Sequence, residues 1–198
     1  MSHKHRPYNA AYHIGDSQRP MNTTGALQFL ITTLISIYCY IILTRFLLQL
    51  VKADFYNPIS QAVVKATNPL LIPLRKIIPG FAGLDWAALI LLYGFQVLKV
   101  AIIFMLQGGG FPVAAILIYG LLQTASLFVW FYIFIIFIQI ILSWVAPQQY
   151  NPMIILLNQI SEPVLAPARK IVPPMGGLDL SPTIVLLILY TLTIWLGL

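Results

Sequence analysis

Two pairs of adjacent cations are the residues of this sequence best suited to bind a charged ligand. Arg75-Lys76 and Arg169-Lys170 are each followed by two apolar residues and a proline. Positive charges beside apolar side chains suit the phosphates of anionic lipids, where each cation contributes about 1 kcal/mol near a membrane surface. In the alternative interpretation, each arginine bonds bidentately to an acidic neighbour and locks its loop to the next helix.

Asp85 and Asp179 are those acidic neighbours. Each stands just before an apolar stretch, where a carboxylate accepts hydrogen bonds from the unpaired amides of a helix N-terminus. We therefore expect both to cap helices, with Ser181-Pro182 as an alternative cap in the second case. Two carboxylates also resemble an acid/base pair, but such pairs lie about 5 to 9.5 Å apart in glycoside hydrolases, and the sequence does not set this distance.

Lys99 lies deep inside a long apolar stretch, fourteen residues after Asp85 and eight before Gln107. A charge at that depth in a membrane costs about 2.5 to 3.5 kcal/mol, and it is usually turned toward polar partners inside the protein. Gln96 shares its helical face, and Ser36, Gln123, Thr124 and Gln139 are polar candidates in other stretches. Two interpretations stay open: a structural lysine that is neutral or snorkels, and a contact for an ion or solute.

The composition excludes most other chemistry. Of 198 residues, 60% are hydrophobic and only 8% are charged, whereas soluble domains are about a quarter charged. Cys39 is the single cysteine, and the three histidines lie in the first thirteen residues. Intrachain disulfides, cysteine-cluster metal sites and a transmembrane histidine pair for haem are therefore excluded. We expect no enzyme activity, no cofactor and no metal, and the net charge of +6 favours a membrane surface over nucleic acid as partner.

Four stretches have the length and polarity of membrane-spanning helices, which need about 20 mostly apolar residues. They are residues 26–50, 86–107, 120–145 and 182–198. A polar tail precedes them over 1–25, and we leave it out of the fold because a second methionine, Met21, lies near its end. The Gly-Pro stretch that begins at 108 separates the second helix from the third, and 108–119 is assigned as an outer linker. Because residues 111–145 are mostly apolar, we expect one helix there, with an interfacial or tilted lead-in before residue 120.

The chain repeats itself at a shift of 94 residues. Positions 56–85 and 150–179 are identical at thirteen of thirty positions without a gap, including Asn57-Pro58 with Asn151-Pro152. Further along, Pro69, Pro73 and Pro79 match Pro163, Pro167 and Pro173. The sequence thus predicts an all-α membrane protein of two parallel helix, Pro-rich loop, helix units, over 26–107 and 120–198.

The Pro-rich loops, residues 51–85 and 146–181, are expected to be short helices broken by kinks, because each proline removes a backbone donor and clashes with the preceding turn. Residues 59–67 carry apolar side chains at helical spacing, as in a helix lying in the headgroup layer. Three roles stay open for these loops: a strap on the lipid surface, a docking surface for a partner, and a re-entrant loop beside a path.

Both loops lie on one side of the membrane if each unit crosses it twice. They hold six of the eleven basic residues, whereas the linker around Gly108 holds none. By the positive-inside rule the loops are cytoplasmic and both termini are outside.

The doubled motif is similar to that of the YggT family, also called YlmG. The resemblance rests on the Asn-Pro opening, the Pro-x3-Pro-x-Arg-Lys-x2-Pro core and the Gly-Leu-Asp closing between four apolar spans, and it extends from about Met21 to the C-terminus. It implies a small protein of the bacterial inner membrane. Bacterial members are linked to osmotic-stress tolerance and to cell division, plastid relatives to cytochrome complex assembly, and no active site comes with the resemblance.

Two functions follow as hypotheses. The first is a non-enzymatic membrane protein whose basic loops bind anionic lipid headgroups or a partner, either another membrane protein or a second copy, with a role in osmotic-stress tolerance or envelope organisation. The second is a small ion or solute channel or transporter with Lys99 near the path.

Overall fold

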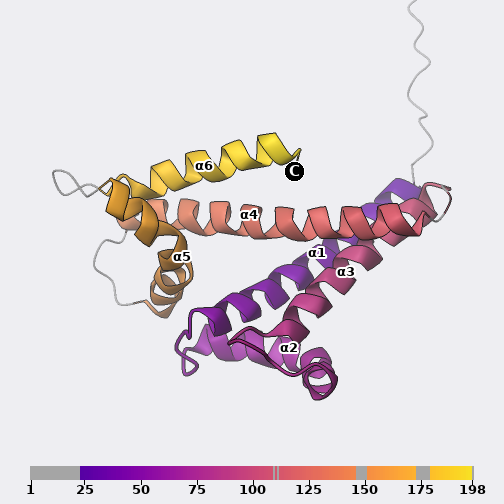
Figure 1. Cartoon of the computed structure of the whole chain (residues 1–198), viewed down its shortest axis with the longest axis horizontal. Helices are drawn as coiled ribbons and strands as arrows, with labels where there is room; N and C mark the ends of the chain where they lie inside the picture. The colour runs from indigo at the N-terminus through magenta and orange to yellow at the C-terminus, as the bar shows by residue number, and fades with distance from the viewer. Residues whose placement is uncertain (1–22, 109, 111, 146–150, 173–178, 198) are drawn as a thin grey trace, which may run out of the picture.

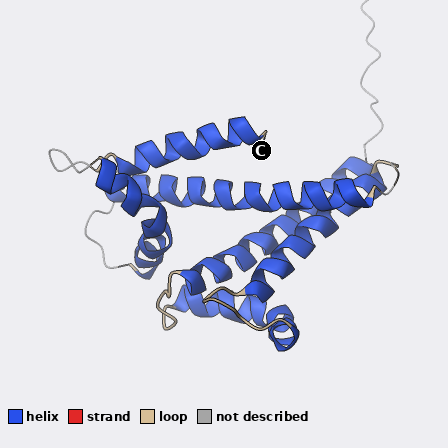
Figure 2. Cartoon of the chain, in the orientation of Figure 1, coloured by secondary structure: helices blue, strands red, loops and turns tan. Residues whose placement is uncertain are grey.

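The computed structural model describes residues 23–108, 110, 112–145, 151–172 and 179–197. Most of the tail expected over 1–25, and parts of the linker 108–119 and of the loop 146–181, lie outside them. The described residues form six helices and one isolated bridge, between Phe81 and Leu84. The helices are α1 Thr23–Leu50, α2 Pro58–Ile77, α3 Trp86–Leu106, α4 Val113–Val145, α5 Pro152–Ile171 and α6 Ser181–Leu196 (Figure 2).

Three of these helices, α1, α3 and α4, are long and apolar enough to cross a membrane. The fourth expected span is α6, which has 16 residues and is therefore about 24 Å long. A bilayer core is about 30 Å thick. The structure thus shows an all-helical protein with three candidate spans and one shorter apolar helix.

Helix α4 includes the lead-in as well as the span expected over 120–145. It begins at Val113, so the outer linker ends at Pro112 rather than at residue 119. Residues 113–119 are apolar and contain neither glycine nor proline, and nothing in them stops a helix that has begun. Gly120, where the span was expected to start, lies inside the helix and is buried.

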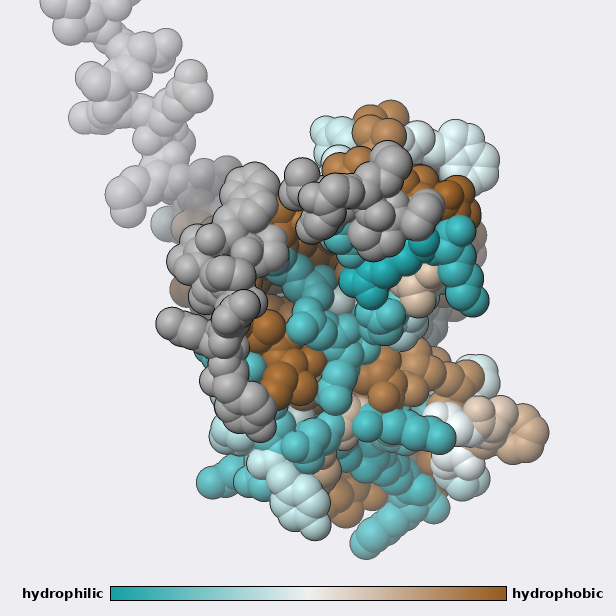
Figure 3. Space-filling model, turned by 90° about the vertical axis from the view of Figure 1, so that its left-hand side faces the viewer, coloured by the Kyte–Doolittle hydropathy of each residue, from teal (hydrophilic) through white to brown (hydrophobic). Residues whose placement is uncertain are grey.

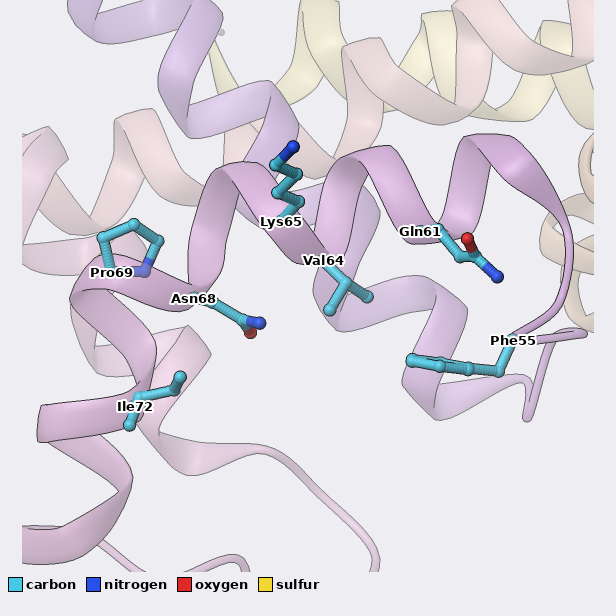
Figure 4. Close-up of a pocket in the computed structure, with 7 residues that line it drawn as sticks. All are labelled: Phe55, Gln61, Val64, Lys65, Asn68, Pro69 and Ile72. Atoms are coloured by element: carbon cyan, nitrogen blue, oxygen red, sulfur yellow. The ribbon is translucent and has the colours of Figure 1, made fainter.

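Helices α2 and α5 correct a second expectation, that the prolines break the loops into short helices. Each helix is continuous over 20 residues and contains two prolines four positions apart, Pro69 and Pro73 in α2 and Pro163 and Pro167 in α5. Each missing N–H costs one hydrogen bond, and helices absorb such losses by kinking. Figure 4 shows the ribbon of α2 turning at Pro69.

The helices run back and forth between two ends of the molecule (Figure 1). α1 and α4 run toward the end that carries α2 and α5, and α3 and α6 run away from it. α3 packs against both α1 and α4, whereas α6 packs against α4 and α5. One core joins α1, α3 and the middle of α4, with Leu71 of α2 and three residues of α5 also buried in it, and a smaller one lies between α4, α5 and α6.

The contact between α3 and α4 depends on a small residue. A Cβ atom on Gly120 would lie 2.6 Å from Cγ2 of Val97 and 3.2 Å from its Cα. Small residues permit such close approach of membrane helices. Glycine is therefore required at position 120 by space.

Gly120→Ala is expected to lower the free energy of unfolding by about 1–2 kcal/mol, because the added methyl group overpacks this contact at a cost of up to about 3 kcal/mol and the helix preference of alanine returns about 1 kcal/mol. Equilibrium unfolding in mixed micelles with a rising fraction of sodium dodecyl sulfate measures the change.

Gly94→Ala in α3 is the matched control, since a Cβ at Gly94 would meet nothing within 4 Å. Alanine favours a helix interior over glycine by about 1 kcal/mol, so this variant should be as stable as the wild type or more so. Equal losses in both variants would contradict the close contact at Gly120.

Candidate functional site

The candidate site is the end of the molecule where α2 and α5 lie. Both helices begin in the same way: Asn57 and Asn151 are the N-cap residues, and Pro58 and Pro152 follow at the first helical position. The Asn57 side chain accepts a hydrogen bond from Ile59 N at 2.9 Å, and Asn151 accepts one from Met153 N at 2.9 Å. The Asn-Pro motif is therefore a helix start, with a side-chain cap and a preset backbone angle.

Asn57 also joins the two helices. Its Nδ2 atom donates to the carbonyl oxygen of Pro152 at 2.8 Å, across 95 residues of chain. Its oxygen caps α2 while its nitrogen holds the start of α5, and this explains why Asn57 is buried whereas Asn151 is exposed. Spacing in the sequence gave no sign of this bond, because only the tertiary fold brings the helix starts together.

The structure brings Arg75 and Asp85 together. Arg75 Nε donates to Asp85 Oδ1 at 3.4 Å, and Arg75 Nη2 pairs with Oδ2, so the contact is bidentate. Asp85 is 3% exposed and is the N-cap of α3, where Oδ1 accepts from Ala88 N at 3.3 Å. The end of α2 is thus held to the start of α3, and Gln49 Oε1 of α1 accepts a further hydrogen bond from Arg75 Nη2 at 3.2 Å.

Arg169 forms the corresponding contacts with two carboxylates. Its Nε atom lies 2.9 Å from Asp179 Oδ2, and its Nη1 atom lies 2.6 Å from Glu162 Oε2. Burial tends to raise the pKa of Asp179, but hydrogen bonds from Ser181 and Arg169 outweigh it, and the pKa lies below the ordinary 3.8. This cluster is more exposed than the Arg75 pair, with a third of the Asp179 side chain open.

Asp179 differs from Asp85 in its place at the helix. Leu180 is the N-cap of α6, and Asp179 stands one residue earlier and accepts from Ser181 N at 2.9 Å. Pro182, the second residue of α6, has no N–H for a cap to bind. The expected helix cap is therefore met by Asp85, while Asp179 binds the first amide from outside the helix.

Lys76 and Lys170 remain exposed and form no ion pair with any residue that the structure describes. Of the four cations singled out from the sequence, the arginines are thus engaged in structural pairs, and the lysines are open to a ligand. Figure 3 looks onto this end and shows hydrophilic residues gathered across its centre and lower part.

A groove of about 710 Å³ follows α2 on one side of its bend. Figure 4 shows Val64, Asn68 and Ile72 projecting from α2 on the side where Phe55 lies, while Lys65 points away. Pro69 and Gln61 complete the lining. The lining is mostly apolar with a few polar groups, which suits an amphipathic ligand rather than a small polar substrate.

Lys99 lies between α3 and α4, 9% exposed, and its Nζ donates to Gln123 Oε1 at 3.4 Å. Gln96 is fully buried, and neither polar atom of its side chain has a partner among the described residues. The structure therefore joins Lys99 to Gln123, one of the partners considered from sequence, and leaves Gln96 apart. In the described part of the chain, no three His, Cys, Asp or Glu side chains gather as a metal site would require.

Asp85→Asn should lower the free energy of unfolding by roughly 2 kcal/mol, between the values for an exposed and a fully buried ion pair. Asparagine still caps a helix, so the loss reports the pair with Arg75. Unfolding in mixed micelles measures it.

Asp179→Asn is the matched control, and the loss there should stay below about 1 kcal/mol because the pair is exposed. A carboxylate with a lowered pKa stabilises the fold above its ordinary pKa, and the contribution disappears as the pH falls through the lowered value. The wild type should therefore lose stability below pH 3.8, and Asp179→Asn should lose part of this dependence. A larger loss for Asp179→Asn than for Asp85→Asn would contradict the assignment.

Comparison with known proteins identifies relatives. The model of the CCB3/YggT family matches residues 24–106 and 118–198. The chain is 51% identical over 157 residues to protein PA0392 of Pseudomonas aeruginosa, covering 78% of this chain and 79% of that protein. It is 38% identical over 175 residues to YggT of Escherichia coli K12, covering 87% and 88%. No solved structure matches it. The names of these relatives state no activity, ligand or partner, but the matches extend over most of the sequence, and the chain belongs to the CCB3/YggT family.

Proposed function

We propose that this protein is a non-enzymatic protein of the bacterial inner membrane whose helices α2 and α5 lie in the cytoplasmic headgroup layer and bind anionic lipids. One observation carries the proposal: Arg75 and Arg169 hold these two helices against the starts of α3 and α6 and leave Lys76 and Lys170 exposed beside them. An amphipathic helix with free cations on its polar side is the usual device for binding an anionic membrane surface.

The groove along α2 supports the same ligand. Val64, Ile72 and Phe55 offer an apolar surface for an acyl chain, and the exposed Lys65 belongs to the lining although its side chain points away from these three in Figure 4. A lipid has an acyl chain, which matches the apolar side chains, and a charged phosphate, which matches the lysine. A partner membrane protein or a second copy of this chain would use the same surface, and the measurements below distinguish them from lipid.

The membrane arrangement is part of the proposal. α6 serves as the fourth span, with its short length met by local thinning of the bilayer. The two units are parallel repeats, supported by the equal lengths and matching starts of α2 and α5 and by their place at one end of the molecule (Figure 1). The basic residues at that end favour the cytoplasmic side, with both termini outside.

The cellular role that fits these features is osmotic-stress tolerance or the organisation of envelope complexes. Binding of helices in the headgroup layer depends on lipid packing and composition. Because osmotic stress changes lipid packing, it would change how strongly α2 and α5 bind in that layer.

Cysteines introduced at Gln61 and Gly110, in a Cys39→Ser background, should be labelled from opposite sides of the membrane. Both positions are exposed, and Cys39 is buried. In spheroplasts an impermeant maleimide should label Gly110→Cys at once and Gln61→Cys only after permeabilisation. Labelling of Gln61→Cys from outside would overturn the topology.

The double variant Lys76→Gln/Lys170→Gln should lose most of the protein's preference for phosphatidylglycerol over phosphatidylcholine. Each lysine near the surface contributes about 1 kcal/mol, so the relative association constant should fall several-fold. Spin-labelled lipids in reconstituted membranes measure this constant, and the wild-type preference should weaken with added salt.

Lys99→Met is the control, because it removes a charge that lies between α3 and α4 and should leave lipid preference unchanged. An unchanged preference in the double lysine variant would refute the lipid proposal. The same proteoliposomes test the channel hypothesis, which the buried polar groups of Lys99 and Gln96 favour. We expect no ion flux above that of empty vesicles. Flux that disappears in Lys99→Met at unchanged stability would favour the channel hypothesis over the lipid-binding one.

A further inference from the structure

A hollow of about 260 Å³ lies where α1 ends and α2 begins, and it shares only Phe55 with the lining of the groove described above. Its polar lining consists of Arg45 and Gln49 from α1, Lys52 from the connection and Ser60 from the first turn of α2, with Leu48 and Phe55 among its apolar walls. The volume is slightly below that of a drug-sized pocket and suits a small group.

Two polar groups in this lining lack partners. Ser60 is 3% exposed, and neither its Oγ atom nor Arg45 Nε, also buried, has a hydrogen-bond partner among the described residues. A buried polar group without a partner costs about 1–3 kcal/mol, and more when it is charged. Both atoms can donate a hydrogen bond, so a ligand that accepts hydrogen bonds would remove this cost.

Lys52 has a backbone conformation that lysine rarely adopts. Its φ is +52°, at the position after α1 where Lys52 N bonds Gln49 O at 3.1 Å and Ala53 N bonds Leu48 O at 2.9 Å. Glycine is the usual residue at this position of a helix end, because a side chain there introduces strain. The strained position places a cation at the hollow.

The balance of charge at the hollow is positive. Its lining contains two cations and no acid. Asp54 lies two residues after Lys52 but does not line the hollow, and its Oδ1 accepts from Tyr56 N at 2.8 Å. Arg75 and Asp85 both interact electrostatically with Arg45, in opposite senses, and they are paired with each other. Gln49 Oε1 is likewise used by Arg75, so the amide nitrogen of Gln49 remains as a donor.

We propose that this hollow binds a phosphate-type oxyanion through Arg45, Lys52 and Ser60. Such an anion accepts several hydrogen bonds and carries the opposite charge. It comes either from a lipid headgroup or from free inorganic phosphate. The site does not use Lys76 or Lys170, so it goes beyond the proposed surface binding and can be tested apart from it.

The second half of the chain provides natural substitutions. At the shift of 94 residues, Arg45, Lys52 and Ser60 correspond to Gln139, Ala146 and Ile154. None of these can bind an anion by charge. The site therefore belongs to the first half of the chain. Arg45→Gln gives the first half the residue that the second half has at the equivalent position, Gln139.

The test uses the full chain purified in a maltoside detergent, which has no phosphate. Inorganic phosphate is the first probe, and its ³¹P line width in NMR reports binding. Phosphatidylglycerol is the second probe, counted as lipid retained in native mass spectrometry. Line broadening without lipid retention assigns the hollow to free phosphate, and a retained lipid assigns it to a headgroup. Either result requires that Arg45→Gln weaken binding about tenfold, as the loss of a charged hydrogen bond implies.

Lys52→Gly keeps the test valid if Arg45→Gln does not fold. Glycine suits a positive φ, so this variant should unfold at a higher temperature than the wild type while it binds the probe more weakly. A purely structural lysine would not give opposite changes in stability and affinity. Absence of binding of both probes, or unchanged binding in both variants, would overturn the proposal.

Lys76→Gln/Lys170→Gln is the matched control and should keep the pocket's affinity. This variant separates the two proposals, because a failure of surface lipid preference leaves the hollow intact, and a failure of the hollow leaves the surface intact.

Discussion

The bidentate pair between Arg75 and Asp85 fixes the geometry on which the rest of the structure depends. It joins the C-terminal end of a kinked helix, α2, to the N-cap of an apolar helix, α3. One carboxylate thereby satisfies a helix amide, neutralises an arginine and sets the angle between the two helices. The pair lies at the polar end of α3, where burying Asp85 is compensated by a hydrogen-bonded partner of opposite charge. Without it, α2 would be tied to the bundle chiefly by apolar contacts such as those of Leu71.

The two halves of the chain both contain an arginine–aspartate pair, but the pairs differ in burial. In the first half the carboxylate is almost completely buried, whereas in the second half Arg169 is shared between Asp179 and Glu162, both open to solvent. Asn68 stands where the second half has Glu162, so the first half has no second carboxylate at this place. The buried ion pair with a single carboxylate is thus in the first half, which also contains the hollow lined by Arg45 and Lys52.

Sequence reasoning predicted the elements better than their contacts. Apolar length is enough to place α1 and α3, because a membrane span is a local property of about 20 residues. The expectation that the prolines break these helices was wrong. One lost hydrogen bond is a local penalty, whereas the continuity of α2 and α5 depends on caps and packing along the whole helix. The pairing of Arg75 with Asp85 was open in the sequence because lipid phosphate and carboxylate are equally good partners for a guanidinium. The bond from Asn57 to Pro152 and the hollow at Lys52 had no local signal, since both depend on where distant segments meet.

The difference in length between the neighbouring helices α4 and α6 has a mechanical consequence for the bilayer. α4 has 33 residues and α6, packed against it, has 16, about 50 Å and 24 Å of helix. No single bilayer thickness matches both, since one exceeds a 30 Å hydrocarbon core and the other falls short of it. In the proposed arrangement, with α6 as the fourth span, the lipids beside α6 adopt a smaller height than those beside α4, and the protein has a step in its hydrophobic belt. Stretching a membrane thins it at constant volume, so in this arrangement lateral tension would favour α6 over α4 and act on the angle between these two helices.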